Sequence, residues 1–251
     1  MARTKAEFEQ VKRLVAERLS DSAIAMRTGI PRPTVVGWRH RQNPPVQAPR
    51  ADNWVVCDGA SYCYVLGCYL GDGHVTRRSA NGWELRLACA QQYPGIIDEI
   101  RAALIRTFPG RLPTSFAASK GGSDVVRISH PAIGRALPQH GAGPKHQRPI
   151  KLLDWQLELT RAHPDALLRG LIHTDGCRVV NRFRTTLPSG RVASYEYVRY
   201  FFSNLSGDIR GIFSDHAALL GIRVTQSNPR NLSIAHRHSV AILERIVGVK
   251  T

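Results

Sequence analysis

The sequence predicts an α+β protein with two pseudo-symmetric halves, each running helix, two strands, helix, two strands, helix, preceded by a small all-helical domain. Three observations support this prediction. A glycine-containing apolar stretch at 62–75 returns at an offset of 103 positions as 167–179. Strand-like and helix-like segments follow each copy in the same order. The N-terminal part shows only helical spacing of apolar residues. The predicted divisions are 1–43, a linker at 44–60, and halves at 61–145 and 146–251.

Composition narrows the choice of partner. The chain has 251 residues, 43% of them hydrophobic, enough for one domain of about 190 residues and a small one. There are 35 Lys and Arg against 19 Asp and Glu, a net charge of +16 and a pI near 10.4. This excess favours a polyanionic partner, most commonly nucleic acid. The alternative is a basic protein from a genome that favours arginine.

Cysteine usage and hydropathy predict a cytosolic protein. The five cysteines form no C-x-x-C pair and are expected to be small buried residues in a reducing compartment. They are Cys57, Cys63, Cys68, Cys89 and Cys177. The first ten residues have no apolar core, and no apolar run reaches the roughly 18 residues of a membrane helix. We therefore expect a bacterial cytoplasmic protein without a membrane partner.

The first domain is predicted to hold three helices. Apolar residues at helical spacing indicate a helix at 5–19, and Ser20 or Asp21 can cap a second at 22–27. After a turn at 28–30, two prolines fit the start of a third helix that runs to about His40. This order resembles the helix-turn-helix modules of bacterial DNA-binding proteins.

On the third helix, Val35 and Trp38 are predicted to pack inward. Four polar residues of this helix and its end are then expected to meet DNA: Arg32, Thr34, Arg39 and Arg41. The alternative is a helical cap with a solvated basic face. The proline-rich residues that follow predict an extended linker.

The two repeated stretches predict buried helices, because they are apolar nearly all round. They share Gly67 and Gly170, Asp72 and Asp175, and Gly73 and Gly176. We expect each helix to end at its closing glycine in a left-handed conformation. Small residues four apart, Gly67 and Gly71 in one copy and Gly170 and Thr174 in the other, allow the helices to pack against each other.

The two aspartates predict a cation site. A carboxylate in the last turn of a helix faces the negative end of the helix dipole, at a cost of a few tenths to about 1 kcal/mol. If the helices pack in parallel, Asp72 and Asp175 meet at one end and repel unless a divalent cation binds there. The backbone carbonyls of Gly71 and Thr174 are expected nearby. The alternative is that the aspartates only cap the following loops.

The remaining elements are predicted in order. In the first half they are strands at 74–78 and 83–89 around an Asn-Gly turn, a helix at 93–108, strands at 114–119 and 124–129, and a short helix at 131–137. Residues 141–164 are expected to cross between the halves. In the second half they are strands at 178–186 and 194–202, a helix at 207–220, strands near 222–226 and 231–236, and a helix to 247. The stretch 127–130 aligns with 233–236.

Arginines mark the predicted DNA surface. Period-two alternation places Arg178, Arg182 and Arg184 on one side of a strand, with Val179 and Phe183 on the other. Comparable positions on or beside strands hold Arg86, Arg127, Arg191 and Arg199. A row of guanidinium groups fits the major groove. A solvated sheet face is the alternative.

The patterns VLGCYLGDG at 65–73 and LRGLIHTDG at 168–176 resemble the two motifs of a single-chain LAGLIDADG homing endonuclease. The resemblance covers about 61–247. It implies two αββαββα repeats that form a DNA-binding saddle in a monomer acting as a pseudo-dimer, with Asp72 and Asp175 binding Mg²⁺ or another divalent cation. The earlier acid of the family motif is absent, because Leu70 and His173 occupy its positions.

The resemblance also implies polar and basic groups near the metals. By strand position we expect Gln92 and Asn204 as the polar pair and Lys120 and Arg230 as the basic pair. No lysine occurs between Lys151 and Lys250, so the strands of the second half offer no partner for a catalytic lysine. The function implied is metal-dependent cleavage of double-stranded DNA, in an intron or intein context. A non-cleaving helix-turn-helix/LAGLIDADG-like regulator is the main alternative, and assistance in RNA splicing is a third.

Overall fold

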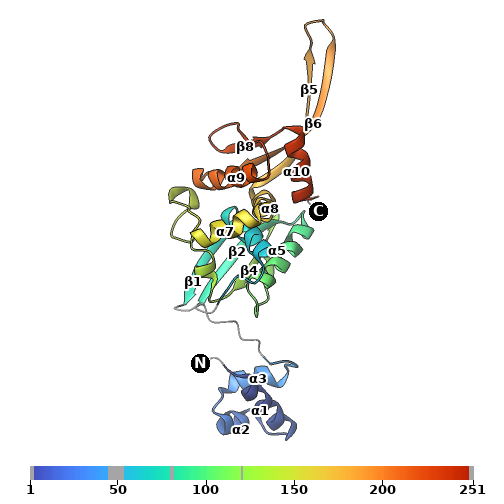
Figure 1. Ribbon diagram of the computed structural model, residues 1–251. Coiled ribbons are helices and arrows are strands. Elements are labelled where there is room, and N and C mark those ends of the chain that lie inside the picture. The colour runs from blue at the N-terminus through green and yellow to red at the C-terminus, as the bar shows by residue number, and fades with distance from the viewer. Residues whose placement is uncertain (1–2, 45–53, 80–81, 120, 249–251) are drawn as a thin grey trace. The chain divides into compact units, whose positions relative to one another are not determined.

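The computed structural model describes residues 3–44, 54–79, 82–119 and 121–248 (Figure 1). The chain divides into two compact units, Met1–Ala48 and Pro49–Thr251. Lys120 and Lys250 lie outside the described residues, as do 45–53 of the predicted linker. Trp54, also within that predicted linker, is buried in the second unit, where its indole donates to Thr107 O at 3.0 Å.

The first unit consists of three helices, α1 (Lys5–Ala16), α2 (Asp21–Thr28) and α3 (Arg32–Arg39). Its N-caps are polar: Thr4 forms a capping box with Glu7, and the Ser20 hydroxyl accepts from the amide of Ala23. Gly29 ends α2 with a left-handed φ of 68°. The core contains Phe8, Val11, Leu14, Ile24, Ile30, Val35 and Trp38. The predicted three-helix order and the inward positions on α3 are confirmed.

The second unit contains two four-stranded antiparallel sheets. The first comprises β1 (Gly73–Ser79), β2 (Gly82–Ala90), β3 (Thr114–Ala117) and β4 (Ser123–Ser129), in the order β1-β2-β4-β3. The second comprises β5 (Gly176–Thr186), β6 (Val192–Ser203), β7 (Thr225–Gln226) and β8 (Asn231–Ile234), in the order β5-β6-β8-β7. The two sheets therefore have the same topology.

Strand pairing confirms how the halves align. In the first sheet Arg86 lies opposite Arg127, and in the second Phe201 lies opposite Ser233. The stretch that begins at Arg127 therefore matches the one that begins at Ser233, as the sequence predicted. The α+β class and the pseudo-symmetric order of elements are both present.

The helices of this unit are α4 (Gly59–Leu70), α5 (Pro94–Thr107), α6 (Ile133–Ala136), α7 (Asp154–Ala162), α8 (Pro164–Asp175), α9 (Gly207–Leu219) and α10 (Arg237–Val247), with a short 3-10 helix η2 (Lys145–Gln147). The prediction gave no helix at α7, which was assigned to the segment between the halves. Its buried residues are Gln156 and Thr160. Trp155 and Leu159 of α7 also pack against the core, so apolar residues at helical spacing were present in this segment.

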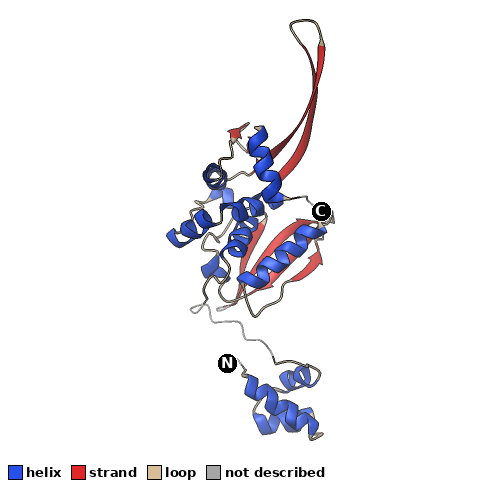
Figure 2. Ribbon diagram, turned by 45° about the vertical axis from the view of Figure 1, so that its right-hand side comes forward, coloured by secondary structure: helices blue, strands red, loops and turns tan. Residues whose placement is uncertain are grey.

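Helices cover one side of each sheet. Leu85 and Leu87 of β2 are fully buried in a core shared with α5, and Phe202 of β6 stacks on Phe213 of α9 with ring centroids 4.4 Å apart. The outer part of the β5–β6 hairpin projects from the body (Figure 2). Among the described residues no helix combines the length and the apolar character needed to cross a bilayer. All five cysteines are free thiols, but the expected burial holds for Cys63, Cys68 and Cys89 and is wrong for Cys57 and Cys177, which are exposed.

Candidate metal and nucleic-acid site

The two motif helices, α4 and α8, pack directly against each other through their glycines. A Cβ on Gly67 would lie 2.9 Å from Leu171 N and 3.1 Å from Gly170 Cα. A Cβ on Gly170 would lie 2.9 Å from Cys68 N. Backbone therefore faces backbone across this contact, the seam, and neither glycine position has room for a side chain. The predicted close packing of the two repeats is confirmed.

The closing glycines have a different role from the predicted one. Gly73 and Gly176 begin strands β1 and β5, and α4 already ends at Leu70. Gly176 has φ −107° and ψ 154°, and neither glycine is among those with positive φ. The predicted left-handed helix ends are therefore wrong. A Cβ on Gly176 would lie 2.7 Å from Ile172 Cα, so glycine is required because each strand starts against the last turn of its helix.

The two motif acids lie at the same end of the seam. Asp175 is the last residue of α8, and a Cβ on Gly71, which directly precedes Asp72, would lie 3.2 Å from Asp175 Cγ. Burial, and next the charge of Asp72, raise the pKa of Asp175 to about 6. The Asn204 amide donates to Asp175 Oδ2 at 2.5 Å. The predicted acid pair and the predicted polar neighbour of Asp175 are thus together.

Other motif positions shape the seam. The Thr174 hydroxyl donates to Gly170 O of its own helix at 3.1 Å, whereas the group expected near a cation was the Thr174 carbonyl. His173 is buried, and its Nδ1 lies 2.8 Å from the Tyr64 hydroxyl of α4, in a hydrogen bond across the seam. Asp72 lines a cavity of about 680 Å³ that extends between β2, α5 and α10.

A lysine that the sequence analysis did not single out completes the site. Lys145 of η2 donates from Nζ to the carbonyl oxygens of Tyr69 at 2.5 Å, Gly71 at 2.5 Å and Gly73 at 3.0 Å. These carbonyls lie at and just beyond the end of α4, where the helix dipole favours a cation. Burial lowers the pKa of Lys145 to about 8, opposed by the charges of Asp175 and Asp72.

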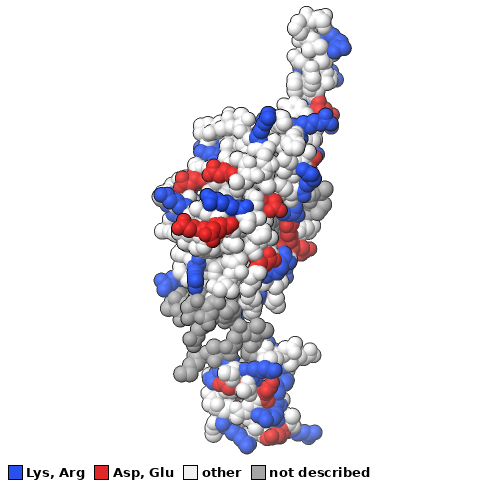
Figure 3. All heavy atoms as spheres, viewed as in Figure 1, with Lys and Arg blue, Asp and Glu red and all other residues white. Residues whose placement is uncertain are grey.

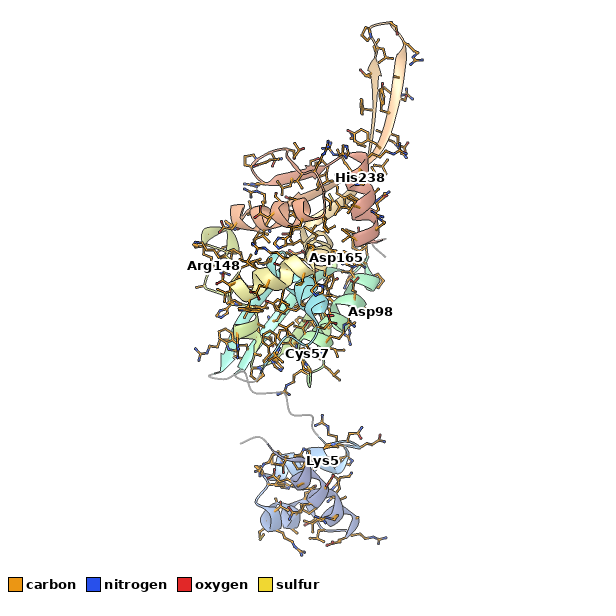
Figure 4. All side chains as sticks on the ribbon, in the orientation of Figure 1. Lys5, Cys57, Asp98, Arg148, Asp165 and His238 are labelled. Carbon is orange, nitrogen blue, oxygen red and sulfur yellow. The ribbon has the colours of Figure 1, made fainter. Side chains whose placement is uncertain are left out.

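Sequence reasoning missed Lys145 because it searched the strands for the basic group. The lysine belongs to the segment between the halves (Figure 4 labels its neighbour Arg148). A usable signal was spacing: Lys145 follows Asp72 by 73 positions, and Lys250 follows Asp175 by 75. Lys250 lies outside the described residues, so only its sequence position can be compared.

The donor set at the seam fits a divalent cation that keeps much of its water. Among the described residues no group of three or more His, Cys, Asp or Glu side chains could hold a metal ion. The protein ligands would be the two carboxylates, Asp72 and Asp175. Magnesium is commonly bound by one or two carboxylates together with waters and substrate phosphates. Burial first and the charge of Asp72 second raise the pKa of Asp175, and a cation bound between the two carboxylates would offset both costs.

The predicted pair of polar residues is only half right. Gly73 lies opposite Leu87 and Gly176 opposite Phe202, so the position in the first half that matches Asn204 is Cys89. Cys89 is buried, and burial followed by the charge of Asp72 raises its pKa to about 12. Gln92 lies three positions further on, exposed in a turn. The prediction of Gln92 is wrong because an apolar thiol takes the place of the polar group.

The predicted basic pair is not related by the pseudo-symmetry. Ser203 pairs with Asn231 as Ala88 pairs with Val125, so Arg230 corresponds to Asp124. Arg230 is exposed in the loop before β8, and its carbonyl accepts from the backbone N–H of Asn204 at 3.0 Å. The two halves thus carry opposite charges at this position.

The arginines of β5 share one side, as predicted. The side chains of Tyr200 and Phe202 lie on the same side of the sheet as these arginines. Helices α9 and α10 cover this side near the base of the hairpin. Arg178 pairs with Glu244 of α10 at 2.8 Å, so it is not on the open face where DNA contact was expected. Further out, Arg182 pairs with Glu196 at 3.0 Å, and Arg184 is exposed.

Three arginines lie on the open sides of the sheets. Arg86 and Arg127 form a cross-strand pair in the first sheet, on the side opposite Leu85 and Leu87. Arg86 contacts Glu84 at 2.7 Å, and Arg127 donates to Thr114 Oγ1 at 3.0 Å. Arg199 lies on the open side of the second sheet, 4.4 Å from the centre of the Phe201 ring.

In the first unit one predicted DNA contact is structural. Arg39 pairs with Asp21 at 2.7 Å and donates to Leu19 O at 2.9 Å, so it ties α3 to the start of α2. The guanidinium of Arg39 is thus engaged within the unit, whereas the prediction assigned it to DNA. Arg32 and Arg41 are exposed and Thr34 is half-buried.

Comparison with known proteins gives fold-level likenesses only. No protein-family model and no curated protein sequence matches the chain. The structure of I-DmoI in complex with DNA and Mn is similar at 16% identity over 77% of this chain and 99% of that one, with a TM-score of 0.48. The LAGLIDADG meganuclease I-AabMI bound to uncleaved DNA is similar at 10% identity over 74% of this chain and 82% of that one, with a TM-score of 0.45. Full-length DUF199/WhiA from Thermatoga maritima is similar at 11% identity over 80% of this chain and 59% of that one, with a TM-score of 0.46.

Proposed function

We propose that this chain is a site-specific, divalent-metal-dependent endonuclease of the LAGLIDADG homing type that cleaves double-stranded DNA. One observation carries the proposal. Asp72 and Asp175 lie at the common end of two glycine-packed helices, beside the ammonium group of the half-buried Lys145. The two motifs that supply these acids, and the net charge of +16, support the same reading.

Each residue of the site has a distinct task in this proposal. The Asn204 amide holds one oxygen of Asp175, which leaves the other oxygen to face a cation. Lys145 binds the carbonyls at the end of α4 and fixes the chain that carries Asp72. Asp72 and Asp175 would hold a divalent cation, which would supply the activation of a water and the stabilisation of the leaving oxygen.

The open sheet faces supply the DNA contacts. Arg86, Arg127 and Arg199 can bind phosphate oxygens or guanine edges in the major groove. In the first unit, exposed Arg32 and Arg41 would add contacts beyond the cut site. We propose that the protein acts in the bacterial cytoplasm as a monomer whose two halves form a pseudo-dimer. Light scattering of the purified chain would test its oligomeric state.

A non-cleaving DNA-binding regulator is the second candidate, and two observations favour it. The Gly71 carbonyl, expected to face a metal, accepts a hydrogen bond from Lys145. The first half also has Cys89 where the second half has Asn204. In this alternative, Lys145 itself balances the charge of the acid pair and no cleavage occurs.

Cleavage can be tested on a randomised duplex library incubated with the full chain and Mg²⁺, followed by sequencing of the new ends. The endonuclease proposal expects defined double-strand ends that Asp72→Asn and Asp175→Asn abolish. Asp98→Asn, at an exposed acid of α5 (labelled in Figure 4), is the matched control and should cut normally. Specific binding without ends in the wild type would support the regulator instead.

Binding itself has an independent test. The affinity for duplex DNA should fall steeply with salt, because each neutralised phosphate contributes a slope of about −0.9 to the plot of log affinity against log salt. An affinity that does not change with salt concentration would refute the proposed DNA binding.

A further inference from the structure

The two halves differ in the length of the hairpin that starts at each motif acid. Strand β1 has 7 residues and its hairpin closes at the pair Ser79 and Gly82. Strand β5 has 11 residues and its hairpin closes at Thr186 and Val192. Both strands begin directly after an acid of the site, so the second hairpin reaches further from it. Four extra residues at about 3.3 Å each add about 13 Å.

The additional reach comes from residues 183–195, which we call the hairpin arm. By strand register Ser79 corresponds to Arg182, so the arm begins where the first hairpin ends. Its sequence, FRTTLPSGRVASY, contains two arginines and no acid. Arg184 and Arg191 are both exposed, and Figure 3 shows basic side chains along the outer part of the hairpin.

The hairpin arm also exposes aromatic surface. Phe183 and Tyr195 stack with ring centroids 5.2 Å apart, and both are 44% exposed. Next to them Tyr197 is 37% exposed. A two-stranded ribbon with this combination of positive charge and exposed rings suits the major groove, which admits a β-ribbon and offers thymine methyl groups to apolar side chains.

We propose that the hairpin arm binds duplex DNA beyond the reach of the first hairpin, which makes the binding site longer on the side of the second half. The inference rests on the proposed DNA binding. At about 3.4 Å per base pair, the additional 13 Å corresponds to about four base pairs. Phe183 and Tyr195 contact base edges or sugars from one side of the ribbon, while Arg184, on its other side, and Arg191, beside the turn, reach the phosphates that flank the groove.

The direct test is footprinting on a duplex that the full chain selects from a randomised pool. In the shortened variant, Asn-Gly replaces 183–195, so that the ion pair of Arg182 and Glu196 closes a hairpin as long as the first one. We expect one edge of the footprint to retreat by about four base pairs while the other edge stays. The salt slope should fall by about two because two phosphate contacts are lost.

A second variant keeps the hairpin length in case the shortened chain does not fold. The double substitution Arg184→Glu and Arg191→Glu should weaken binding to the selected duplex at least tenfold. On a duplex trimmed by about four base pairs at that end, the variant and the wild type should bind equally.

The outcomes separate this inference from the proposed function. Specific binding by the intact chain, with a footprint and affinity that neither variant changes, would overturn the role of the hairpin arm and leave DNA binding intact. The absence of any specific protection by the intact chain would refute both.

Discussion

Adding one methyl group at the seam should destabilise the second unit, although the same change elsewhere stabilises helices. In Gly170→Ala the new Cβ would lie 2.9 Å from Cys68 N and 3.1 Å from Gly67 Cα. Overpacking typically costs about 1 to 3 kcal/mol, and the upper end applies because these backbone atoms cannot rotate away. Alanine recovers about 1 kcal/mol of helix propensity. The free energy of unfolding should therefore fall by roughly 2 kcal/mol.

Gly211→Ala is the matched control, because Gly211 lies within α9 and a Cβ there would meet nothing within 4 Å. This variant should gain up to about 1 kcal/mol. Both effects can be measured by urea unfolding with tryptophan fluorescence, since Trp54 and Trp155 lie in the second unit. If Gly170→Ala were as stable as the wild type, the direct backbone contact between the repeats would be refuted.

Three further predictions concern charged groups. Burial and a neighbouring carboxylate raise the pKa of Asp175 to about 6, above roughly 3.9 in an unfolded chain, so the folded chain binds this proton more tightly. At about 1.4 kcal/mol per pKa unit, the free energy of unfolding should consequently fall by roughly 3 kcal/mol as the pH rises from below about 4 to above about 6, and Asp175→Asn should remove this fall in urea titrations across that range. Lys145→Met should lower the free energy of unfolding by about 2 to 3 kcal/mol, because three carbonyls lose their donor; an unchanged urea midpoint would contradict this. Arg39→Ala should destabilise the first unit by about 1 kcal/mol through loss of its pair with Asp21. Arg32→Ala should instead weaken DNA binding and leave the melting temperature of the first unit unchanged. If Arg39→Ala weakened DNA binding and Arg32→Ala lowered the melting temperature, the two assignments would be wrong.

The repeat made most of the architecture predictable. The sequence contains residues that recur at a fixed offset, such as Gly67 with Gly170 and Asp72 with Asp175. This recurrence indicates two copies of one packing arrangement. Alternating apolar residues located both hairpins of the first sheet to within one or two residues, because one face of that sheet is buried. These features depend on local pattern and are visible in the sequence alone.

Other features depend on three-dimensional approach, which local pattern does not encode. Gly73 and Gly176 were identified as necessary, but the reason is the close return of the strand onto the helix and not a positive φ. Lys145 was overlooked because it reaches the site from a connecting segment. The expected strand position pointed to Gln92, whereas the strand register assigns that place to Cys89.

Arginine on its own was also a weak guide. The sequence pattern predicted DNA contacts for Arg178 on a strand and Arg39 on a helix, yet Arg178 is paired with Glu244 and Arg39 with Asp21. An acidic residue distant in sequence can form an ion pair with the guanidinium, which then stabilises the fold and is less available to a ligand. Only coordinates can supply that pairing.

The three hydrogen bonds of Lys145 give the segment between the halves a second role. A linker that only joined two domains could be lengthened, cut or replaced without consequence. Here it delivers an ammonium group to the helix end of the first half, next to an acid from each half. A two-fragment version of the protein should therefore keep residues 137–153 attached to the first half, and a library of altered linkers should tolerate changes in length only after Lys145.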